Sequence, residues 1–316
     1  MCIQKKIRNY LYRLKIFILF IKYFGRNFRP DTIRASKIYL NLMKILNYRE
    51  YSLRKKYITR KIDFKKNIKN DLGYGIFSNN TFQNPKKILT ALNSLKKDYN
   101  LINWNLIQKE SKKSFLMSYS IKLDDRIKLI ASEIVNVVTN YIGFYPVLLQ
   151  CQFWNSPNKY TCKGRSQQWH IDGEDYKQLK VFIPIEDITN DSGPLNIIDA
   201  SNSKIIYDDL IKKNVIQQRN TKIDDSLINS YVSENQIKKM TIKFGEFGFV
   251  DTCRCYHFGS RRDKKPRKLL FLHFTSAFSE NLPSIFRKPN SFYKTVEDKL
   301  LYGYSYQNYK DLGRFG

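Results

Sequence analysis

Several features that would place a protein in a particular class are scarce in this sequence. It contains five cysteines among 316 residues, an odd number without the spacing of a disulfide framework. Reduced thiols suit an intracellular compartment, so we expect a cytoplasmic protein. The apolar run from Ile16 to Ile21 is too short to span a bilayer, and no small-residue cleavage site follows it. These observations favour neither a transmembrane helix nor a secretory signal peptide.

Acidic residues are also scarce, with 28 Asp and Glu against 56 Lys and Arg and a net charge of +28. Residues 1–66 hold nineteen Lys or Arg and three Asp or Glu, so this fifth of the chain carries +16 of the excess. A basic protein often binds a polyanion. Here the charge is concentrated in one segment, and the abundance of Lys, Asn, Ile, Tyr and Phe also fits adenine- and thymine-rich codons. We therefore predict no specific nucleic-acid partner.

The first thirty residues have the pattern of a basic amphipathic helix. Basic and apolar positions fall on separate helical faces, namely Arg8, Lys15 and Lys22 on one and Leu11, Leu14, Ile18 and Ile21 on the other. Such a helix could make peripheral contact with an anionic membrane, or dock on a partner. It could also pack on the rest of the protein and leave its basic face in water, which is the interpretation we favour.

The remaining composition indicates one folded domain with additions. A hydrophobic content of 42% and an aromatic content of 15% exclude a disordered chain. We expect a basic, helical N-terminal extension over residues 1–70 and a single domain over 71–316. Helical spacing over 84–95 and 124–141 predicts buttressing helices. Residues 203–240 form a polar insertion, predicted to be helical, that either covers the binding site or only elaborates the surface.

Apolar runs bounded by turn residues predict the core strands. These runs cover residues 145–154, 179–185, 241–257 and 267–274, and a strand is also expected over 165–172, which has no helix signature and ends at Gly173. The run over 241–257 contains glycines and is expected to form two short strands.

Three histidines are present in the whole chain, and two of them belong to the most informative pattern in it. In an extended strand, residues i and i+2 project from one face about 6.7 Å apart, so His170 and Asp172 could chelate one ion. His257 would supply a third ligand. Two imidazoles and one carboxylate with open positions are typical of non-haem Fe(II) sites, whereas structural zinc is usually closed by four ligands.

Arg267 adds a second element to this pattern. It lies ten residues after His257 and begins an apolar run that predicts a core strand. A guanidinium entering a core needs an anionic partner, and its planar fork suits one end of a dicarboxylate such as 2-oxoglutarate. The alternative is an ordinary structural ion pair with an Asp or Glu of the chain.

Together, these motifs resemble the phytanoyl-CoA dioxygenase family of Fe(II)/2-oxoglutarate oxygenases. The resemblance covers about residues 152–278, less than half of the chain. It depends on 169–172, on 179–187 leading to 192–195, on 250–257, and on Pro266 with Arg267.

The resemblance implies an α+β fold with a mainly β core, a double-stranded β-helix or cupin-like jelly-roll barrel. It implies that His170, Asp172 and His257 bind Fe(II), and that Arg267 binds the distal carboxylate of 2-oxoglutarate. With O2 as the other co-substrate, the expected reaction hydroxylates a small or conjugated organic molecule and releases succinate and CO2. Gln152 and Phe182 match positions that line the co-substrate, and barrel packing is their alternative role.

Other assignments compete for the same residues. Cys253, Cys255 and His257 share strand parity and could bind zinc, although zinc-binding cysteine pairs usually have wider spacing. His273 is interpreted as a hydrogen-bonded histidine near the end of the barrel opposite Arg267. Glu174 to Tyr176 could contact substrate or form a turn.

The substrate and any wider role are less defined by the sequence. Arg254, Arg261 and Arg262 could attract an anionic substrate or could be solvated surface charges. Two other functions remain open: a non-catalytic basic binding or scaffold protein on a jelly-roll fold, and a nucleic-acid demethylase of the same cofactor class. No oligomeric state is predicted.

Overall fold

Two antiparallel sheets form the centre of the computed structural model, which describes residues 37–58, 67–110, 116–157, 165–216, 221–259, 261, 264–279, 293 and 295–305. The larger sheet has the strand order β1 (Tyr74–Ser78), β7 (Glu246–Val250), β4 (Leu179–Pro184), β9 (Arg267–Thr275), β3 (Val147–Ser156) and β2 (Met117–Ser120). The smaller sheet has the order β6 (Lys238–Met240), β5 (Leu195–Ile197) and β8 (His257–Phe258). This arrangement confirms the expected mainly β core of jelly-roll type, although the sheets do not close into a barrel.

Strict alternation along the central strands separates the two faces of the larger sheet. In β4, Val181 and Ile183 join the main hydrophobic core, while Phe182 belongs to the cluster shared with the smaller sheet. In β9, Leu270 and Leu272 likewise lie in the main core, and Leu269 and Phe271 lie in the second cluster. Since successive side chains of a strand point to opposite faces, Lys180 and Arg267 are directed to the inner face, toward the smaller sheet.

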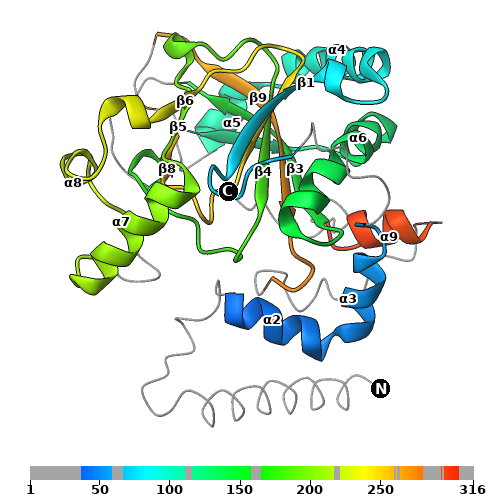
Figure 1. Ribbon diagram of the computed structural model, residues 1–316. Coiled ribbons are helices and arrows are strands. Elements are labelled where there is room, and N and C mark those ends of the chain that lie inside the picture. Colours follow the sequence, from blue (N-terminus) through cyan, green and yellow to red (C-terminus); the bar gives the residue numbers. More distant parts are fainter. Residues whose placement is uncertain are drawn as a thin grey trace.

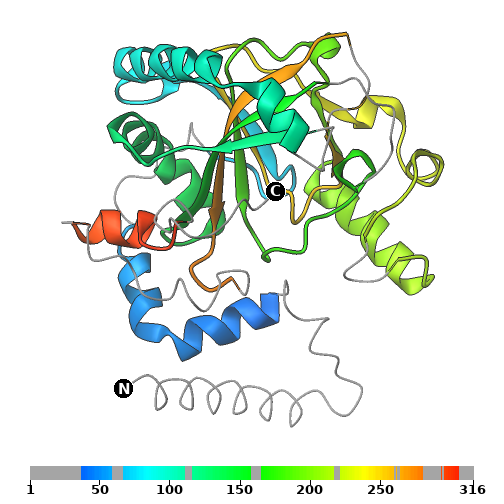
Figure 2. The same cartoon turned by 180° about the vertical axis from the view of Figure 1, so that it is seen from behind.

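Helices cover both outer sides of this pair of sheets. Figures 1 and 2 show α4, α5 and α6 beside the larger sheet and α7 and α8 beyond the smaller one. The helices are α2 (Lys37–Leu46), α3 (Tyr48–Lys55), α4 (Pro85–Leu101), α5 (Trp104–Glu110), α6 (Asp125–Ile142), α7 (Ala200–Lys212), α8 (Asp225–Asn229) and α9 (Val296–Tyr302).

The predicted helices over 84–95 and 124–141 are confirmed, and their ends have clear physical causes. Pro85 occupies the first turn of α4, where its missing N–H is not needed. At α6, the Asp124 side chain accepts hydrogen bonds from the backbone N–H groups of Arg126 and Ile127. The helix ends at Gly143, whose φ of 91° is the left-handed conformation that glycine adopts readily.

Two expectations about strands need correction. Residues 165–172 do not form a strand: Arg165–Gln167 is a 3-10 helix, and Trp169 and His170 make only isolated bridges. The ligand-bearing segment connects β3 and β4 and pairs with its neighbours at Trp169 and His170 alone, so it has no continuous partner strand. In the predicted helical segment 203–240, α7 and α8 are helical as expected, but Lys238–Met240 forms strand β6 of the smaller sheet.

The helices α2 and α3 belong to the predicted N-terminal extension but contribute to the main core. Leu40 and Met43 are buried in that core. Arg54 is fully buried and pairs with Glu50 of the same helix. It also donates to the carbonyl groups of Tyr145, Pro146 and Leu300. The predicted amphipathic helix of residues 1–30 lies outside the described residues. Within the described ranges, no helix has the length and apolarity needed to cross a membrane.

Candidate metal centre

His170 and His257 face each other across a short antiparallel bridge between the two sheets. The N–H of His170 donates to the carbonyl oxygen of His257 over 3.1 Å, and the reverse hydrogen bond measures 3.0 Å. Directly opposed residues of such a pair project their side chains to the same side. The two imidazole rings accordingly lie with their centroids 4.3 Å apart. The backbone of both segments thus brings these two histidines together.

Asp172 reaches the same point from the segment that follows His170. Its N–H donates to the carbonyl oxygen of Thr252 over 2.9 Å, which anchors the segment to the chain before β8. Its Oδ1 lies 3.5 Å from Nε2 of His170, and its Oδ2 lies 3.8 Å from Nε2 of His257. One potential ligand atom from each of the three residues lies within 4.8 Å of the others. The predicted constellation is therefore assembled, although by a loop instead of the expected strand.

The hydrogen bonds of the two rings leave their Nε2 atoms available as ligands. Nδ1 of His170 donates to the carbonyl oxygen of Gln168 over 2.8 Å, and Nδ1 of His257 donates to that of Cys255 over 2.9 Å. A carbonyl oxygen only accepts, so each Nδ1 carries the proton and each Nε2 keeps a lone pair. This outer support is typical of metal-binding histidines.

Burial and charge set the ionisation of these groups in favour of binding a cation. Burial, together with the adjacent His170, lowers the pKa of His257 to about 3, so the ring is neutral at neutral pH. Burial raises the pKa of Asp172, but Lys180 and the two histidines lower it by more, and the pKa lies well below its usual value. The site thus presents the neutral imidazole of His257 and the carboxylate of Asp172, beside Nε2 of His170.

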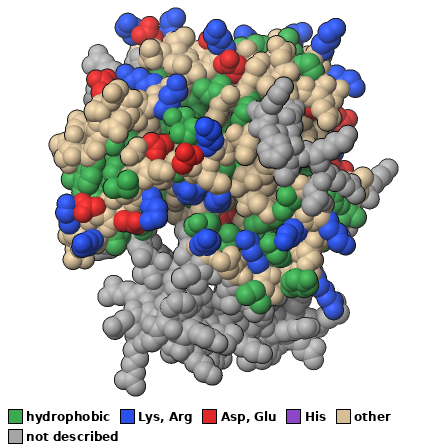
Figure 3. All heavy atoms as spheres, viewed as in Figure 1, with side chains coloured by type: hydrophobic (Ala, Val, Ile, Leu, Met, Phe, Trp, Pro, Cys, Tyr) green, Lys and Arg blue, Asp and Glu red, His purple; other side chains and the backbone are tan. Residues whose placement is uncertain are grey.

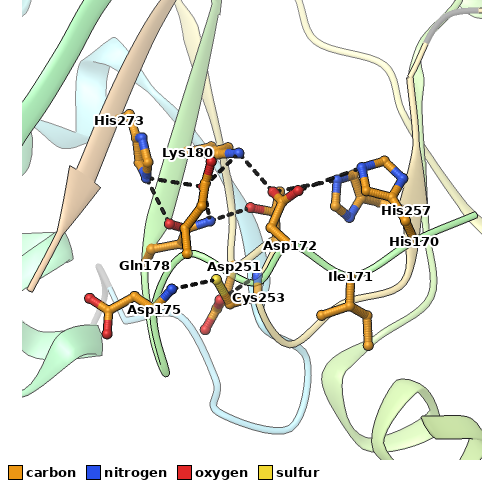
Figure 4. Close-up of polar contacts among 12 residues, drawn as sticks. His170, Ile171, Asp172, Asp175, Gln178, Lys180, Asp251, Cys253, His257 and His273 are labelled. Atoms are coloured by element: carbon orange, nitrogen blue, oxygen red, sulfur yellow. Dashed lines mark hydrogen bonds and ion pairs between the residues drawn. The ribbon is translucent and has the colours of Figure 1, made fainter. Parts of the chain in front are cut away.

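Lys180 is a close neighbour of this site that was not predicted from the sequence. Its Nζ lies 2.7 Å from Oδ2 of Asp172 and 3.1 Å from Oε2 of Glu174. Burial lowers the pKa of Lys180, but these two carboxylates raise it by more, so the amine stays protonated. In Figure 4, Lys180 lies on one side of Asp172 and the two histidines lie on the other. The only available signal was a charged residue within the apolar run of residues 179–185.

Lys180 belongs to a buried network that extends to β9. Nε2 of Gln178 donates to Oε2 of Glu174 over 2.9 Å and to Oγ1 of Thr252 over 2.8 Å. Nε2 of His273 donates to Oε1 of Gln178 over 2.7 Å. The prediction that His273 is hydrogen-bonded is confirmed. It lies at the opposite end of β9 from Arg267, as expected, but that end is the one paired with Lys180. Burial lowers the pKa of His273 to about 4.

Arg267 is buried on the inner face and has no carboxylate within ion-pair distance among the residues that the structure describes. It donates to the carbonyl oxygen of Gly193 over 3.2 Å and to Oγ of Ser156 over 3.4 Å, while its buried Nε has no hydrogen-bond partner. Burial lowers its pKa to about 10. The alternative of an internal ion pair therefore finds no support in the described ranges, and the guanidinium has capacity for an anion.

The surroundings of Arg267 form a small apolar pocket close to the histidine bridge. The pocket is lined by Phe182, Ile188, Leu195, Met240, Ile242, Arg267 and Leu269. Gly259 lies two residues after His257, and a Cβ atom placed on it would be 3.7 Å from Nη2 of Arg267. Phe182 is one of the side chains that line this pocket, and its role at the co-substrate stays a prediction. Gln152 is buried on β3, and its Oε1 accepts a hydrogen bond from Nε1 of Trp154.

The competing zinc site is not assembled. The metal-binding group of the described chain contains His257 but neither cysteine. Sγ of Cys253 accepts the N–H of Asp175 over 3.3 Å, and Cys255 is buried with its Sγ 3.5 Å from the carbonyl oxygen of Leu72. Asp175, which could contact substrate or form a turn, accepts a hydrogen bond from the Thr275 hydroxyl through its side chain. This contact gives it a structural role.

The arginines predicted to attract an anionic substrate have protein partners. Arg254 donates to the hydroxyl of Tyr141 over 3.0 Å. Arg261 pairs with Asp225 over 2.8 Å and lies 3.6 Å above the ring of Phe258. Arg262 lies outside the described residues. An anionic substrate stays a prediction.

Comparisons with known proteins concern the fold. No protein-family model matches the sequence, and no curated protein matches it. Similar solved structures include EctD from S. alaskensis with 2-oxoglutarate and 5-hydroxyectoine, at 17% identity over 66% of this chain and 74% of that chain, with a TM-score of 0.45. EvdO2 from Micromonospora carbonacea var. aurantiaca has 14% identity over 65% of this chain and 87% of that chain, with a TM-score of 0.42.

A third similar structure is SnoK, described as a non-haem alpha-ketoglutarate-dependent carbocyclase. It has 11% identity over 66% of this chain and 81% of that chain, with a TM-score of 0.41. The matched structures are 2-oxoglutarate-dependent oxygenases, the broad class that the sequence resemblance indicated, and these three do not single out the phytanoyl-CoA dioxygenases. At such identities and TM-scores, the likeness does not by itself assign an activity to this chain.

Proposed function

We propose that this protein is an Fe(II)- and 2-oxoglutarate-dependent oxygenase that hydroxylates a small organic substrate. The observation that carries the proposal is the convergence of His170, Asp172 and His257 beside a buried Arg267 that lacks a carboxylate partner in the described chain. A metal ion and a dicarboxylate would complete these two incomplete sites together.

The three candidate ligands fit a metal ion in both chemistry and spacing. Adjacent ligands that each lie about 2.1 Å from one ion are roughly 3 Å apart. The observed separations from Asp172 to His170 and His257 are 3.5 and 3.8 Å, so small side-chain rotations would close the site. Two imidazoles and one carboxylate, with other positions left open, are the ligand set of non-haem Fe(II) oxygenases.

The pocket at Arg267 fits the distal carboxylate of 2-oxoglutarate. A buried guanidinium without an anion is costly, and bidentate pairing with a carboxylate would use its planar fork. The other lining side chains, including Phe182, Leu269 and Met240, are apolar and would exclude water from that ion pair. We further propose that Gln152 lies along the same face as part of the co-substrate site.

When bound, Fe(II) with 2-oxoglutarate and O2 supplies the oxidising chemistry, and the overall reaction converts a C–H bond to an alcohol while forming succinate and CO2. The chain's own part is to hold and orient. His170 and His257 offer lone pairs that their carbonyl partners fix in direction, and Asp172 supplies negative charge. Arg267 would orient the co-substrate from its far end. The apolar lining would keep bulk water away from the reacting atoms.

The direct test is succinate formation from 2-oxoglutarate by anaerobically purified protein supplied with Fe(II), ascorbate and O2. Uncoupled turnover requires no knowledge of the substrate. We expect activity in the wild type, none in His170→Ala, and activity in Arg267→Met only at raised 2-oxoglutarate. Arg261→Met is the matched control and should resemble the wild type, because Arg261 already pairs with Asp225.

An absence of succinate together with an absence of divalent-metal binding in the wild type would contradict the proposal. That result would favour the non-catalytic binding protein. The nucleic-acid demethylase alternative is addressed by salt-dependent binding of DNA or RNA. Figure 3 shows the Lys and Arg side chains of the described residues spread over one face, with acidic and hydrophobic side chains between them. The described residues therefore form no concentrated basic patch on this face that would favour nucleic-acid binding.

A further inference from the structure

Lys180 occupies an unusual place for a lysine, inside a central strand and on its buried face. Its neighbours across the sheet are Val250 of β7 and His273 of β9. Only 13% of its side chain is exposed. A charged group in such a position is costly unless it is fully paired. Its two carboxylate partners provide that pairing, but a hydrophobic residue would provide packing without any charge.

The contact of Lys180 makes the two oxygens of Asp172 unequal. Oδ2 receives the ammonium hydrogen bond over 2.7 Å. Oδ1 receives no hydrogen bond from the residues that the structure describes, and it lies 3.5 Å from Nε2 of His170. Without Lys180, either oxygen could turn toward a cation between the histidines, or both could bind it together. Oδ2 also lies 3.8 Å from Nε2 of His257, but its hydrogen bond with the ammonium group competes with binding of a cation, so Oδ1 is the oxygen left without a donor.

Other side chains hold the ammonium group in this position. Glu174 contacts it over 3.1 Å from the other side. Gln178 is fully buried and fixes the Glu174 carboxylate, and the Gln178 carbonyl is in turn bound by His273. The contacts run from His273 to Gln178, then through the Glu174 carboxylate to Lys180 and on to Asp172 (Figure 4). The direction of the Asp172 carboxylate is thereby coupled to rigid strands of the larger sheet.

We propose that Lys180 is a positioning residue that restricts Asp172 to binding the metal ion through a single oxygen, which keeps enough coordination positions open for the keto acid and O2 together. This inference rests on the proposed function. A carboxylate that binds through both oxygens would occupy one more position on the metal ion. The positions that remain would then be too few for a chelating keto acid and O2 together.

The proposal separates two affinities that usually change together. Removing a nearby positive charge should leave the affinity for a divalent cation unchanged or increase it. The keto acid, in contrast, should bind more weakly, because its two chelating atoms would be confined to the two positions that remain and could no longer take the pair that faces Arg267. Loss of an outer contact to a ligand typically changes affinity or activity by about tenfold to 100-fold. We expect a decrease of that size for 2-oxoglutarate.

The experiment compares the wild type, Lys180→Met and Lys177→Met, each titrated first with Co(II) and then with 2-oxoglutarate. Methionine preserves the length of the side chain without its charge. Lys177 is the matched control because its Nζ contacts Asn70 and the carbonyl oxygen of Tyr141. Absorption of Co(II) reports its coordination, and calorimetry of the Co(II)-loaded protein gives the 2-oxoglutarate affinity. Neither readout requires turnover.

For Lys180→Met we expect Co(II) binding at least as tight as in the wild type, an altered Co(II) spectrum, and binding of 2-oxoglutarate that is weaker by about tenfold or more. Lys177→Met should match the wild type in the spectrum and in 2-oxoglutarate affinity. If Lys180→Met keeps both the wild-type spectrum and the wild-type 2-oxoglutarate affinity, the proposal is wrong. Loss of Co(II) binding in this variant would also overturn it, because the role assigned to Lys180 is not to create the metal site.

A second variant covers the case in which Lys180→Met does not fold because Glu174 loses its partner. The double variant Lys180→Met/Glu174→Gln removes both charges and should show the same selective loss of 2-oxoglutarate affinity. Wild-type affinity in a folded double variant would contradict the proposal. If the wild type itself binds neither Co(II) nor 2-oxoglutarate, the proposed function fails, and this result is distinct from either outcome for Lys180.

Discussion

Two buried arginines show how differently one residue type can be used in this chain. Arg54 is fully buried, and its guanidinium is satisfied by Glu50 and by three backbone carbonyl groups. Arg267 is 5% exposed, has no carboxylate partner among the described residues, and leaves its Nε without a hydrogen bond. The first arginine completes the fold by itself. The second keeps a donor without a partner, which a bound anion would use.

This contrast predicts opposite effects of the same substitution. Arg54→Met should lower the free energy of unfolding by about 3 kcal/mol, because it leaves buried carbonyl groups and Glu50 without their partner. Arg267→Met should leave the unliganded protein as stable as the wild type or slightly more stable, since it removes an unpaired buried charge. Chemical denaturation of each protein with and without 2-oxoglutarate, in the presence of Co(II), measures both effects.

The free energy of unfolding of the wild type should rise by about 2.7 kcal/mol at a 2-oxoglutarate concentration 100 times the dissociation constant. Arg267→Met should lose this gain at the same concentration, and Arg54→Met should retain it. A large loss of stability in unliganded Arg267→Met would show that the guanidinium is a structural group and would remove the main argument for an anion site.

At the scale of elements, the segment after α7 supports the loop that carries two of the candidate ligands. Oγ1 of Thr221 accepts the N–H of Ile171 over 2.9 Å and donates to its carbonyl oxygen over 2.8 Å. Ile223 forms a bridge with Trp169. The predicted insertion of residues 203–240 therefore contacts the site from behind, at the backbone between His170 and Asp172.

Replacing Thr221 by Val should weaken metal binding more than it weakens the fold. The substitution preserves shape but removes both hydrogen bonds to Ile171, which frees the loop between the two ligands. We expect about a tenfold decrease in Co(II) affinity, with a loss of about 1 kcal/mol in unfolding free energy. Thr139→Val is the control, because the buried hydroxyl of Thr139 has no hydrogen-bond partner. Equal Co(II) affinities in the two variants would argue against a supporting role for Thr221.

The elements that were predicted from the sequence are those determined by local pattern. The nearly continuous apolar runs in 179–185 and 267–274 reflect burial of both faces of a central strand, and the helix after Asp124 follows from an N-terminal cap and apolar spacing. The identity of the site residues His170, Asp172 and His257 was also predictable, because their types and spacing carry chemical meaning.

What could not be predicted depends on contacts between distant segments. The bridge of His170 to His257, the ion pair of Lys180 with Asp172, and the bonds of Thr221 to Ile171 each require the three-dimensional register of the two sheets. Residues 165–172 lack a helix signature, but in the structure only Trp169 and His170 pair with neighbouring segments, as isolated bridges to Ile223 and His257. Local propensity could not reveal this difference.

At the scale of the whole molecule, the candidate metal centre lies where the two sheets approach each other. His257 belongs to β8 of the smaller sheet, while Lys180 and Arg267 belong to β4 and β9 of the larger one. A metal ion at this junction would add ligand bonds to the hydrogen bonds that already join these segments. Helices α4 and α6 pack on the opposite side of the larger sheet and take no part in the junction.

Metal binding should therefore slow hydrogen exchange selectively. With Co(II), the exchange rate of backbone amides in residues 168–172 and in β8 should fall to about one tenth or lower. Local opening of these segments would require release of the ion. Amides of α4 and α6 should change little under the same conditions. Mass spectrometry of the exchanged protein, with His170→Ala as control, tests this expectation. Uniform protection of all elements would show global stabilisation and not a local link.

The alternation along β4 and β9 also bears on how this protein can change over generations. Loss or gain of one residue within β4 would exchange the two faces, so that Lys180 and Phe182 would point into the main core and Val181 and Ile183 toward the site. Such a change destroys packing and chemistry in one step. Heritable variation in these strands is therefore limited to substitutions, while changes in length can accumulate in the connections between them.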